Sequence, residues 1–232
     1  MICEEKLSVS VFGLGYVGSV VAALLASRGH SVIGVDVIQS KVDAMNAGQA
    51  TFYEPELATL TSEARRLDRL RATTSTATAI AETDISLICV GTPSTAAGSL
   101  DLTFVEEVTC GIATALRDKS SKHHLIYRST MLPGSTRGLV ENQLKDPVEQ
   151  GSLQVFFFPE FLRQGSAVKD MVDPSLSVIG SYDPESDISG IQGLLESSTE
   201  RTDLESAELI KYACNAFHAS KVAFAFASAW NG

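Results

Sequence analysis

One segment near the N-terminus restricts the fold of this chain more than any other. The run Ser8-Val9-Ser10-Val11-Phe12 predicts a buried strand, and it leads directly into a Gly-x-Gly-x-x-Gly turn over 13–18. A helix rich in Ala, Val and Leu is predicted over 19–28, and a second strand over 31–35 ends at Asp36. A strand, this turn, a helix, a strand and a terminal acid in this order are typical of a dinucleotide-binding unit.

Each glycine of the turn has a separate role in such a unit. Gly13 allows the tight turn, Gly15 lets a pyrophosphate approach the backbone, and Gly18 lets the helix pack close to the strand. The N-terminus of the helix presents unpaired N–H groups and the positive end of its dipole to the phosphates. A glycine-containing turn in another kind of α/β protein is the alternative, which the complete order of elements disfavours.

Asp36 also indicates which dinucleotide is bound. Its carboxylate can accept hydrogen bonds from both ribose hydroxyls, whereas a 2′-phosphate beside it would meet like charge. The next residues, 37–39, offer no arginine to offset that charge, and Lys41 is the nearest cation. We therefore predict NAD as the cofactor rather than NADP, with Lys41 as the observation that weighs against this choice.

The rest of the chain alternates helical and strand patterns, which predicts the α/β class with a doubly wound parallel sheet. Helices are predicted over 39–47, 56–70, 79–82, 103–117 and 135–144, and strands over 85–90, 124–128, 155–158 and 176–179. A boundary is predicted near 199–204, because a single helix rich in Ala and aromatic residues begins at Ser206. Residues 1–203 are thus predicted to form a Rossmann-type NAD-binding domain.

Composition excludes several classes of partner. The 232 residues are 44% hydrophobic and 20% charged, as in soluble globular proteins. A net charge of −10 argues against nucleic acid and anionic membrane surfaces, and no apolar run has the length of a membrane span. The N-terminus has no signal pattern, which predicts a cytoplasmic location. The cysteines form no metal-like cluster, and Cys89 and Cys110 are expected to be small buried hydrophobic residues in a reducing compartment.

Three later strands end in polar loops at the edge where an open parallel sheet binds its ligand. These loops cover 90–93, 129–134 and 159–165. Thr92 and Thr130 suit contact with a ribose or a nicotinamide, although a turn or helix-cap role explains each threonine equally well.

Glu160 lies just beyond the apolar run 155–158. A carboxylate at the mouth of an apolar strand suits a general base or a water-orienting group. A solvated loop acid, or an ion-pair partner of Arg163, is the alternative, and position alone does not separate these interpretations.

A second polar pattern lies on the C-terminal helix. Lys211, Asn215 and His218 are spaced by four and three residues, so they share one helical face. Lys211 there would stabilise a developing alkoxide, with Asn215 and His218 binding substrate oxygens. In the alternative interpretation Lys211 and His218 face water and Asn215 has no role.

Taken together, these motifs resemble the UDP-glucose/GDP-mannose dehydrogenase family over residues 7–225. The motifs that carry the resemblance are Phe12–Gly18, Val35-Asp36, Cys89–Pro93, Arg128–Thr130 with Leu132–Gly134, Pro159–Arg163 and Lys211–Asn215. Members of the family oxidise the C6 hydroxyl of a nucleotide sugar to a carboxylate by two successive NAD-dependent hydride transfers. The resemblance therefore implies a nucleotide-sugar substrate, and a homodimer or higher oligomer for the full-length protein.

Site residues follow from the resemblance by position. The cofactor-binding residues would be Gly13, Gly15, Tyr16, Val17, Gly18, Asp36, Lys41, Thr92 and Thr130. Glu160, Lys211, Asn215 and His218 would face the sugar nucleotide. Lys211 and Asn215 would stabilise the oxyanion, Glu160 would assist proton transfer or hydrolysis of the covalent intermediate, and Thr130 completes the implied catalytic set.

The substrate choice rests on the helix. Cys214-Asn215 followed by His218-Ala219 favours GDP-mannose, oxidised to GDP-mannuronate, with UDP-glucose as the alternative. The pathway served would supply a uronic acid sugar nucleotide for an exopolysaccharide such as alginate.

The chain departs from the family in its length. Family members are nearly twice as long, and their catalytic cysteine lies in a Gly-Gly-Ser-Cys-type loop that has no counterpart in this sequence. Residues 204–232 are therefore expected to be a truncated start of the central helical and dimerisation segment. The isolated chain is expected to be inactive, and a non-catalytic NAD-binding fragment is the second functional hypothesis.

Overall fold

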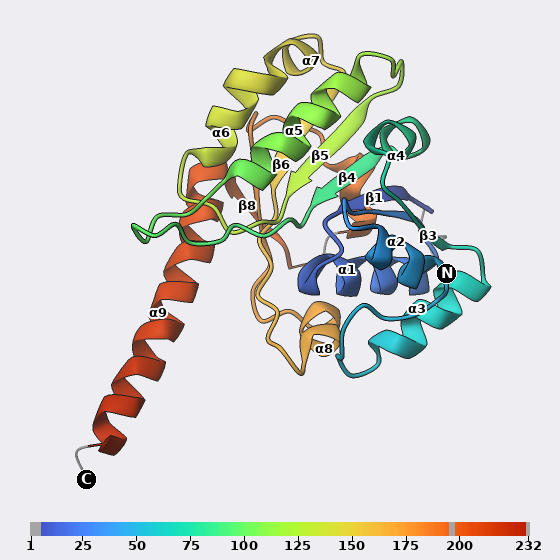
Figure 1. Cartoon of the computed structure of the whole chain (residues 1–232). Helices are drawn as coiled ribbons and strands as arrows, with labels where there is room; N and C mark the ends of the chain where they lie inside the picture. Colours follow the sequence, from blue (N-terminus) through green and yellow to red (C-terminus); the bar gives the residue numbers. More distant parts are fainter. Residues whose placement is uncertain (1–5, 195–197, 231–232) are drawn as a thin grey trace.

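The computed structural model describes residues 6–194 and 198–230, and it shows an eight-stranded sheet between two layers of helices (Figure 1). The strands are β1 (Ser8–Phe12), β2 (Ser31–Val35), β3 (Leu70–Thr73), β4 (Ile85–Ile88), β5 (His123–Tyr127), β6 (Leu153–Phe157), β7 (Val178–Ser181) and β8 (Glu200–Asp203). The helices are α1 (Tyr16–Ser27), α2 (Gln39–Asn46), α3 (Leu57–Arg66), α4 (Thr76–Glu82), α5 (Thr103–Leu116), α6 (Ser135–Leu139), α7 (Lys145–Glu149), α8 (Ala167–Val172) and α9 (Leu204–Trp230). A π-helix, η1 (Val140–Leu144), joins α6 to α7, and a 3-10 helix, η2 (Ser189–Leu194), follows β7.

The strand order is β3-β2-β1-β4-β5-β6-β7-β8. The strands from β3 to β6 in this order pair in parallel, which confirms the predicted doubly wound sheet. The prediction of a parallel sheet is wrong at one edge, because β7 is antiparallel to β6 and β8 is parallel to β7. The order reverses between β1 and β4, and sheets of this kind bind ligands at the carboxyl ends of the strands at such a point.

Side chains of successive strand residues alternate between two apolar layers. Val9 and Val11 of β1 pack with Ile126 of β5 on the α1 side, whereas Phe12 and Tyr127 pack on the side of α4, α5 and α6. Both faces of these strands are buried, so the polar residues in them are enclosed as well, and Ser10 of β1 forms a hydrogen bond with Ser86 of β4 at 2.7 Å. The sheet thus holds the carboxyl ends of its central strands in fixed positions.

Two cysteines behave differently from one another. Cys89 is buried, as predicted, but Cys110 is exposed. The expectation for Cys110 is wrong because it lies on the outer face of α5, whose buried face carries Val105, Thr109 and Ile112.

Several element boundaries differ from the predictions. The predicted helix 56–70 ends at Arg66, since Asp68 takes a positive φ of 53° that breaks the helix. Leu70, the last residue of the predicted helix, is instead the first residue of β3. The predicted helix 135–144 changes to a π-helix at Val140, and β7 begins later than the predicted strand 176–179. The elements α7, α8 and β8 were not predicted. Polar, mostly exposed β8 has no apolar signal, because it is an edge strand.

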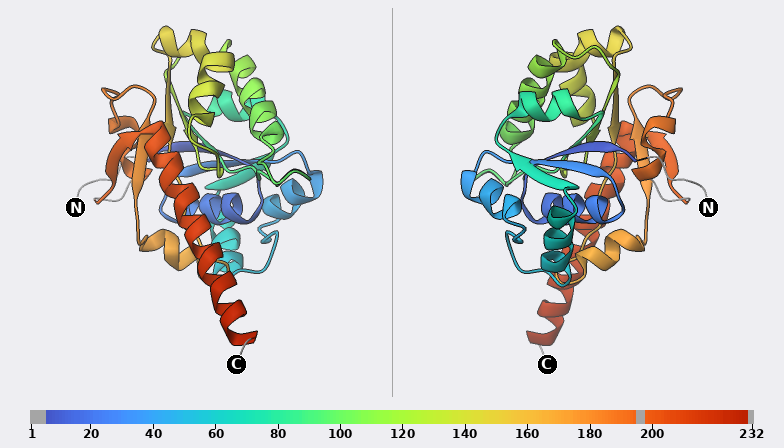
Figure 2. Two further views of the ribbon diagram at one scale, coloured as in Figure 1. Left: turned by 90° about the vertical axis from the view of Figure 1, so that its left-hand side faces the viewer. Right: turned by 90° about the vertical axis from the view of Figure 1, so that its right-hand side faces the viewer.

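Helix α9 leaves the body of the domain (Figures 1 and 2). It begins at Leu204, two residues before the predicted start, and Leu204 and Ala207 are fully buried against the sheet. From Tyr212 to Ser228 every side chain is exposed or half-buried. Within the described residues, no helix is both long and apolar enough to cross a lipid bilayer.

Candidate functional site

The turn between β1 and α1 accepts only glycine at two positions. Gly13 has a φ of +92°, and a Cβ there would lie 3.0 Å from the backbone of Cys89. A Cβ on Gly18 would lie 1.8 Å from the carbonyl oxygen of Gly13. A Cβ on Gly15, in contrast, would meet no atom within 4 Å, so the backbone there is open to a ligand at the N-terminus of α1. This arrangement fits a pyrophosphate.

Asp36 connects the end of β2 to this turn. Its carboxylate, which is almost fully buried, accepts hydrogen bonds from the Leu14 amide at 2.7 Å and the Ile38 amide at 3.0 Å. Lys41 Nζ lies 3.1 Å from Asp36 Oδ2, so this lysine is paired with the acid. A carboxylate offers about four acceptor positions, so capacity remains for a ribose hydroxyl.

A cavity of about 250 Å³ lies at the carboxyl ends of β1, β4 and β5. Its lining residues are Gly15, Tyr16, Val17, Cys89, Val90, Gly91, Thr92, Arg128, Ser129, Thr130 and Glu160. The structure therefore brings the two predicted threonines and Glu160 together with the glycine turn. Thr92 Oγ1 donates a hydrogen bond to the Thr130 carbonyl at 2.8 Å, which joins the loops after β4 and β5.

Tyr16 uses its hydroxyl within the protein. The hydroxyl donates to Glu54 Oε2 at 2.9 Å and lies 3.1 Å from the Arg163 carbonyl oxygen. Burial and the neighbouring Glu54 raise the pKa of Tyr16 well above its usual value, so the phenol stays protonated. Glu54, which is buried, also accepts from the amides of Gly165 and Ala167. The sequence gives no local signal for Glu54, an acid in a loop before a proline.

Glu160 and Lys211 form a buried ion pair at the rim of the cavity. Lys211 is 4% exposed, its Nζ lies 2.9 Å from Glu160 Oε1, and it also donates to the Glu160 carbonyl. The second carboxylate oxygen accepts from the Leu162 amide at 2.8 Å. Arg163 pairs with Asp170 instead. The alternatives in which Glu160 is solvated or pairs with Arg163, and in which Lys211 faces water, are therefore wrong.

The polar stripe on α9 is divided. Lys211 is buried against Glu160, but Asn215 and His218 lie further along the helix and are exposed. The structure thus does not bring these two residues into contact with Glu160. Among the described residues, no three His, Cys, Asp or Glu side chains are grouped as a metal site would require.

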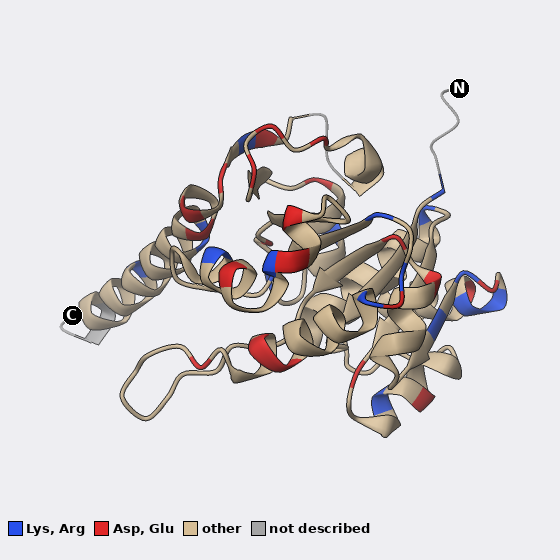
Figure 3. Ribbon diagram, turned by 90° about the horizontal axis from the view of Figure 1, so that it is seen from above, with Lys and Arg blue, Asp and Glu red and all other residues tan. Residues whose placement is uncertain are grey.

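Helix α9 is held on the domain by two acids that were not predicted. Glu208 is fully buried and accepts hydrogen bonds from the Gly134 amide at 2.6 Å, the Thr136 amide at 2.8 Å and the Thr136 hydroxyl at 2.6 Å. Burial raises the pKa of Glu208, an effect that these hydrogen bonds partly offset. Glu205 forms an ion pair with Arg137 at 2.5 Å. The charged residues of α9 lie mostly near its start (Figure 3). Glu205 and Glu208 precede Lys211 at intervals of three residues, and this spacing is the sequence signal for their contacts with the domain.

These features define a dinucleotide-binding α/β domain of the Rossmann type with an ion pair suited to acid–base chemistry at its rim. A family model described as the UDP-glucose/GDP-mannose dehydrogenase family, NAD binding domain, matches residues 7–196. The chain belongs to this family, and the matched part is its NAD-binding domain.

Individual relatives agree with this assignment. The chain is 41% identical over 227 residues to GDP-mannose 6-dehydrogenase from Azotobacter vinelandii. This match covers 94% of this chain and 51% of the relative. The crystal structure of a ternary complex of GDP-mannose dehydrogenase from Pseudomonas aeruginosa superposes with a TM-score of 0.86 at 41% identity, covering 94% of this chain and 51% of that one. UDP-glucose dehydrogenase from Pyrobaculum islandicum gives a TM-score of 0.89 at 37% identity, covering 97% and 52%. The chain spans about half the length of the curated relatives it matches.

Proposed function

We propose that this chain is the NAD-binding half of a dehydrogenase that oxidises the C6 hydroxyl of GDP-mannose to the carboxylate of GDP-mannuronate. The observation that carries the proposal is the buried Glu160–Lys211 pair at the rim of the cofactor cavity that Thr130 lines. The 41% identity to a GDP-mannose 6-dehydrogenase supports this substrate, and the 37% identity to a UDP-glucose dehydrogenase keeps UDP-glucose as the alternative.

The proposed roles follow from the geometry. Bound NAD supplies the acceptor for the hydride from C6. The open backbone at Gly15 and the N-terminus of α1 bind the pyrophosphate, with Tyr16 and Val17 beside it, and Asp36 binds a ribose hydroxyl.

At the sugar, the charge of Lys211 stabilises the oxygen that loses its proton. Glu160, oriented by Lys211 and the Leu162 amide, accepts that proton or orients water. Thr130, on the wall of the cavity, belongs to the proposed catalytic residues. Asn215 and His218, which are exposed on α9 in this chain, bind sugar oxygens.

The second oxidation needs a further group. In the family a cysteine in a Gly-Gly-Ser-Cys-type loop forms the covalent intermediate, and this sequence has no such motif. Cys89 is not a substitute, because burial raises the pKa of its thiol to about 12. We therefore expect the chain alone to bind NAD without completing the four-electron oxidation.

The organisation of the whole protein belongs to the same proposal. Residues 1–203 form the NAD-binding domain, and 204–232 form the start of a central helical segment through which the full-length family dimerises. The location is cytoplasmic, and the product supplies an exopolysaccharide such as alginate.

A chimera tests this function. Residues 1–225 replace the matched half of the Azotobacter vinelandii enzyme, and NADH formation from GDP-mannose is measured. We expect activity, and we expect Lys211→Met to lower kcat by about 10²–10³. Lys145→Met, at an exposed position on α7, should leave kcat unchanged.

Other outcomes have defined meanings. NADH formation from UDP-glucose but not from GDP-mannose would assign the alternative substrate. NAD binding without NADH formation from either sugar nucleotide would reject the enzyme proposal in favour of a non-catalytic NAD-binding module.

A further inference from the structure

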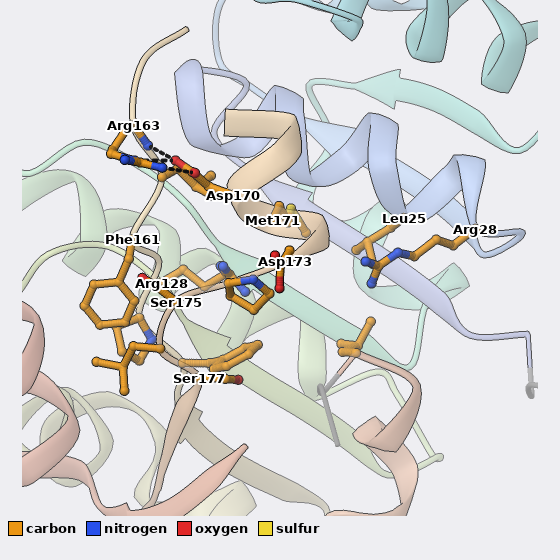
Figure 4. A pocket seen from close by; sticks show the side chains of 16 residues that line it. Leu25, Arg28, Arg128, Phe161, Arg163, Asp170, Met171, Asp173, Ser175 and Ser177 are labelled. Carbon is orange, nitrogen blue, oxygen red and sulfur yellow. Dashed lines mark hydrogen bonds and ion pairs between the residues drawn. The ribbon is translucent and has the colours of Figure 1, made fainter. Parts of the chain in front are cut away.

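A second cavity lies beside the cofactor cavity, on the α1 side of the sheet (Figure 4). It has a volume of about 110 Å³ and lies between the C-terminal end of α1, helix α8 and the segment 173–177 that leads into β7. The cofactor cavity is more than twice as large, at about 250 Å³. The second cavity is therefore too small for a dinucleotide or a nucleotide sugar, but it suits a single small ion or functional group.

Arg128 is the unusual residue of this cavity. It directly follows β5, is 7% exposed, and lines both cavities. Within the part of the chain that the structure describes, its Nε is enclosed without a hydrogen-bond partner, and no acid forms an ion pair with its guanidinium. Its guanidinium carbon lies 4.8 Å from the centre of the Phe158 ring.

A buried guanidinium without a direct ion-pair partner is unfavourable, and the charge of nearby Glu160 offsets only part of the effect of burial on the pKa of Arg128. Burial lowers the pKa of Arg128, but arginine remains protonated in proteins, so the charge persists. A cation–π contact compensates only part of the lost hydration. Two neighbouring acids pair with other cations, since Glu160 binds Lys211 and Asp170 binds Arg163. Asp173, on the wall of the cavity, is exposed and forms no ion pair with Arg128 among the described residues. The unpartnered Nε of Arg128 thus remains as a buried donor for a ligand.

We propose that this cavity is a binding site for a small oxyanion of the phosphate or carboxylate class, held by Arg128. The planar guanidinium matches two oxygens of such a group. Ser175 offers a hydroxyl on the cavity wall, and the Ser177 hydroxyl lies there as well, sharing a hydrogen bond with Thr199 Oγ1 at 2.7 Å. Asp173 on the same wall is exposed and opposes high negative charge, which favours a singly charged anion.

The site is distinct from the glycine turn that binds the cofactor phosphates, and it does not depend on the substrate proposed above. Arg128 lines both cavities, and the loop that carries Glu160 also contributes Phe161 and Leu162 to the wall of this one. A bound oxyanion would therefore contact the same loop that carries Glu160, on the side away from the cofactor cavity.

Thermal unfolding of the whole chain tests the site, with sodium phosphate or sodium acetate compared with sodium chloride at equal ionic strength. A ligand of the folded state raises the unfolding midpoint by mass action, by about 3 °C at a tenfold excess over Kd. We expect this shift with at least one anion in the wild-type protein, and we expect it to persist at saturating NAD. Arg128→Met should lose the shift, whereas Arg66→Met, at an exposed position on α3, should keep it.

Three results would overturn the proposal. A shift that NAD abolishes but Arg128→Met retains would place the anion on the glycine turn. An equal shift in all proteins would be a general salt effect. No shift with either anion would mean that no such site exists.

If Arg128→Met does not fold, the wild-type protein labelled with ¹⁵N-arginine provides the same test. One Nε–H resonance should move saturably as phosphate or acetate is added at constant ionic strength. Uniform small movements of all arginine resonances, or none, would contradict the proposal.

Discussion

The two halves of the candidate site are assembled in different ways. The glycine turn and Asp36, the first half, come from one continuous segment, in which the Leu14 amide and the Asp36 carboxylate that close the turn are 22 residues apart. The ion pair, the second half, joins Glu160 to Lys211, which are 51 residues apart and lie on separate elements. The first half therefore depends on local sequence, whereas the second depends on the docking of α9.

Helix α9 repeats this contrast along its own length. Glu205, Glu208 and Lys211 follow one another at about one helical turn, and each has a partner on the domain. Asn215 and His218 continue on that side of the helix but are exposed. Burial of a polar side chain on this helix thus depends on a partner on the domain, and a place on the shared helical face is not sufficient.

Loss of Glu208 should have the largest effect on this docking. Glu208→Ala removes the acceptor for three hydrogen bonds and leaves the buried Thr136 amide unpaired. We expect a loss of about 3 kcal/mol in the free energy of unfolding, or about 6–12 °C in the midpoint. Glu205→Ala, which breaks a partly exposed ion pair, should cost less than about 1 kcal/mol. Equal small losses at both positions would show that Glu208 does not anchor the helix.

The ion pair of the site should show coupling. Lys211→Met leaves Glu160, whose side chain is 12% exposed, without its cation, and we expect a loss of about 2 kcal/mol. The double variant with Glu160→Gln should recover part of that loss, because neither charge is then left unpaired. The free energies of unfolding of the four proteins give the coupling, and strictly additive losses would contradict the interaction.

The stability of the fold should decrease at acidic pH because of a histidine in the sheet, and not because of α9. His123 on β5 is fully buried, its Nε2 lies 2.8 Å from Ser86 Oγ, and burial, aided by the charge of Lys119, lowers its pKa from 6.5 to about 3. The folded state thus binds fewer protons than the unfolded state between these values. The stability present above pH 6.5 is therefore lost as the pH falls towards 3, at up to about 1.4 kcal/mol per pH unit.

Denaturant unfolding between pH 7 and pH 4 measures this slope. His123→Gln should make it shallower, whereas His218→Gln, at an exposed position, should not change it. An unchanged slope in His123→Gln would mean that this histidine is not held neutral by the fold.

The smallest effect should come from the exposed part of α9. Asn215→Ala and His218→Ala should each change the free energy of unfolding of this chain by less than about 0.5 kcal/mol, because neither side chain is buried. A loss above about 1 kcal/mol for either variant, measured beside Lys211→Met, would show that the stripe contacts the domain as a unit.

The same contrast explains what the sequence predicts. The central strands and the glycine turn are predictable, because these strands are rich in apolar residues and Gly13 and Gly18 have no room for a side chain. The polar edge strand β8 and the six-residue helix α8 carry no such pattern.

At the site, Glu160 and Lys211 are predictable as separate candidates, but their pairing is not, since it depends on where α9 crosses the domain. Glu54, Glu208 and the unpaired guanidinium of Arg128 are not predictable. Their roles depend on burial and on amides far away in the sequence, such as the Gly165 amide that binds Glu54.

The affinity of the purified chain for NAD and for NADP, measured by isothermal titration calorimetry, tests the cofactor half most directly. Asp36 lies at the end of β2, and the cation beside it, Lys41, is already paired with it. We expect NAD to bind, and NADP to bind at least about tenfold more weakly, or about 1.4 kcal/mol. Equal affinity for the two dinucleotides, or no binding of NAD, would contradict the assignment of residues 8–36 as an NAD-selective site.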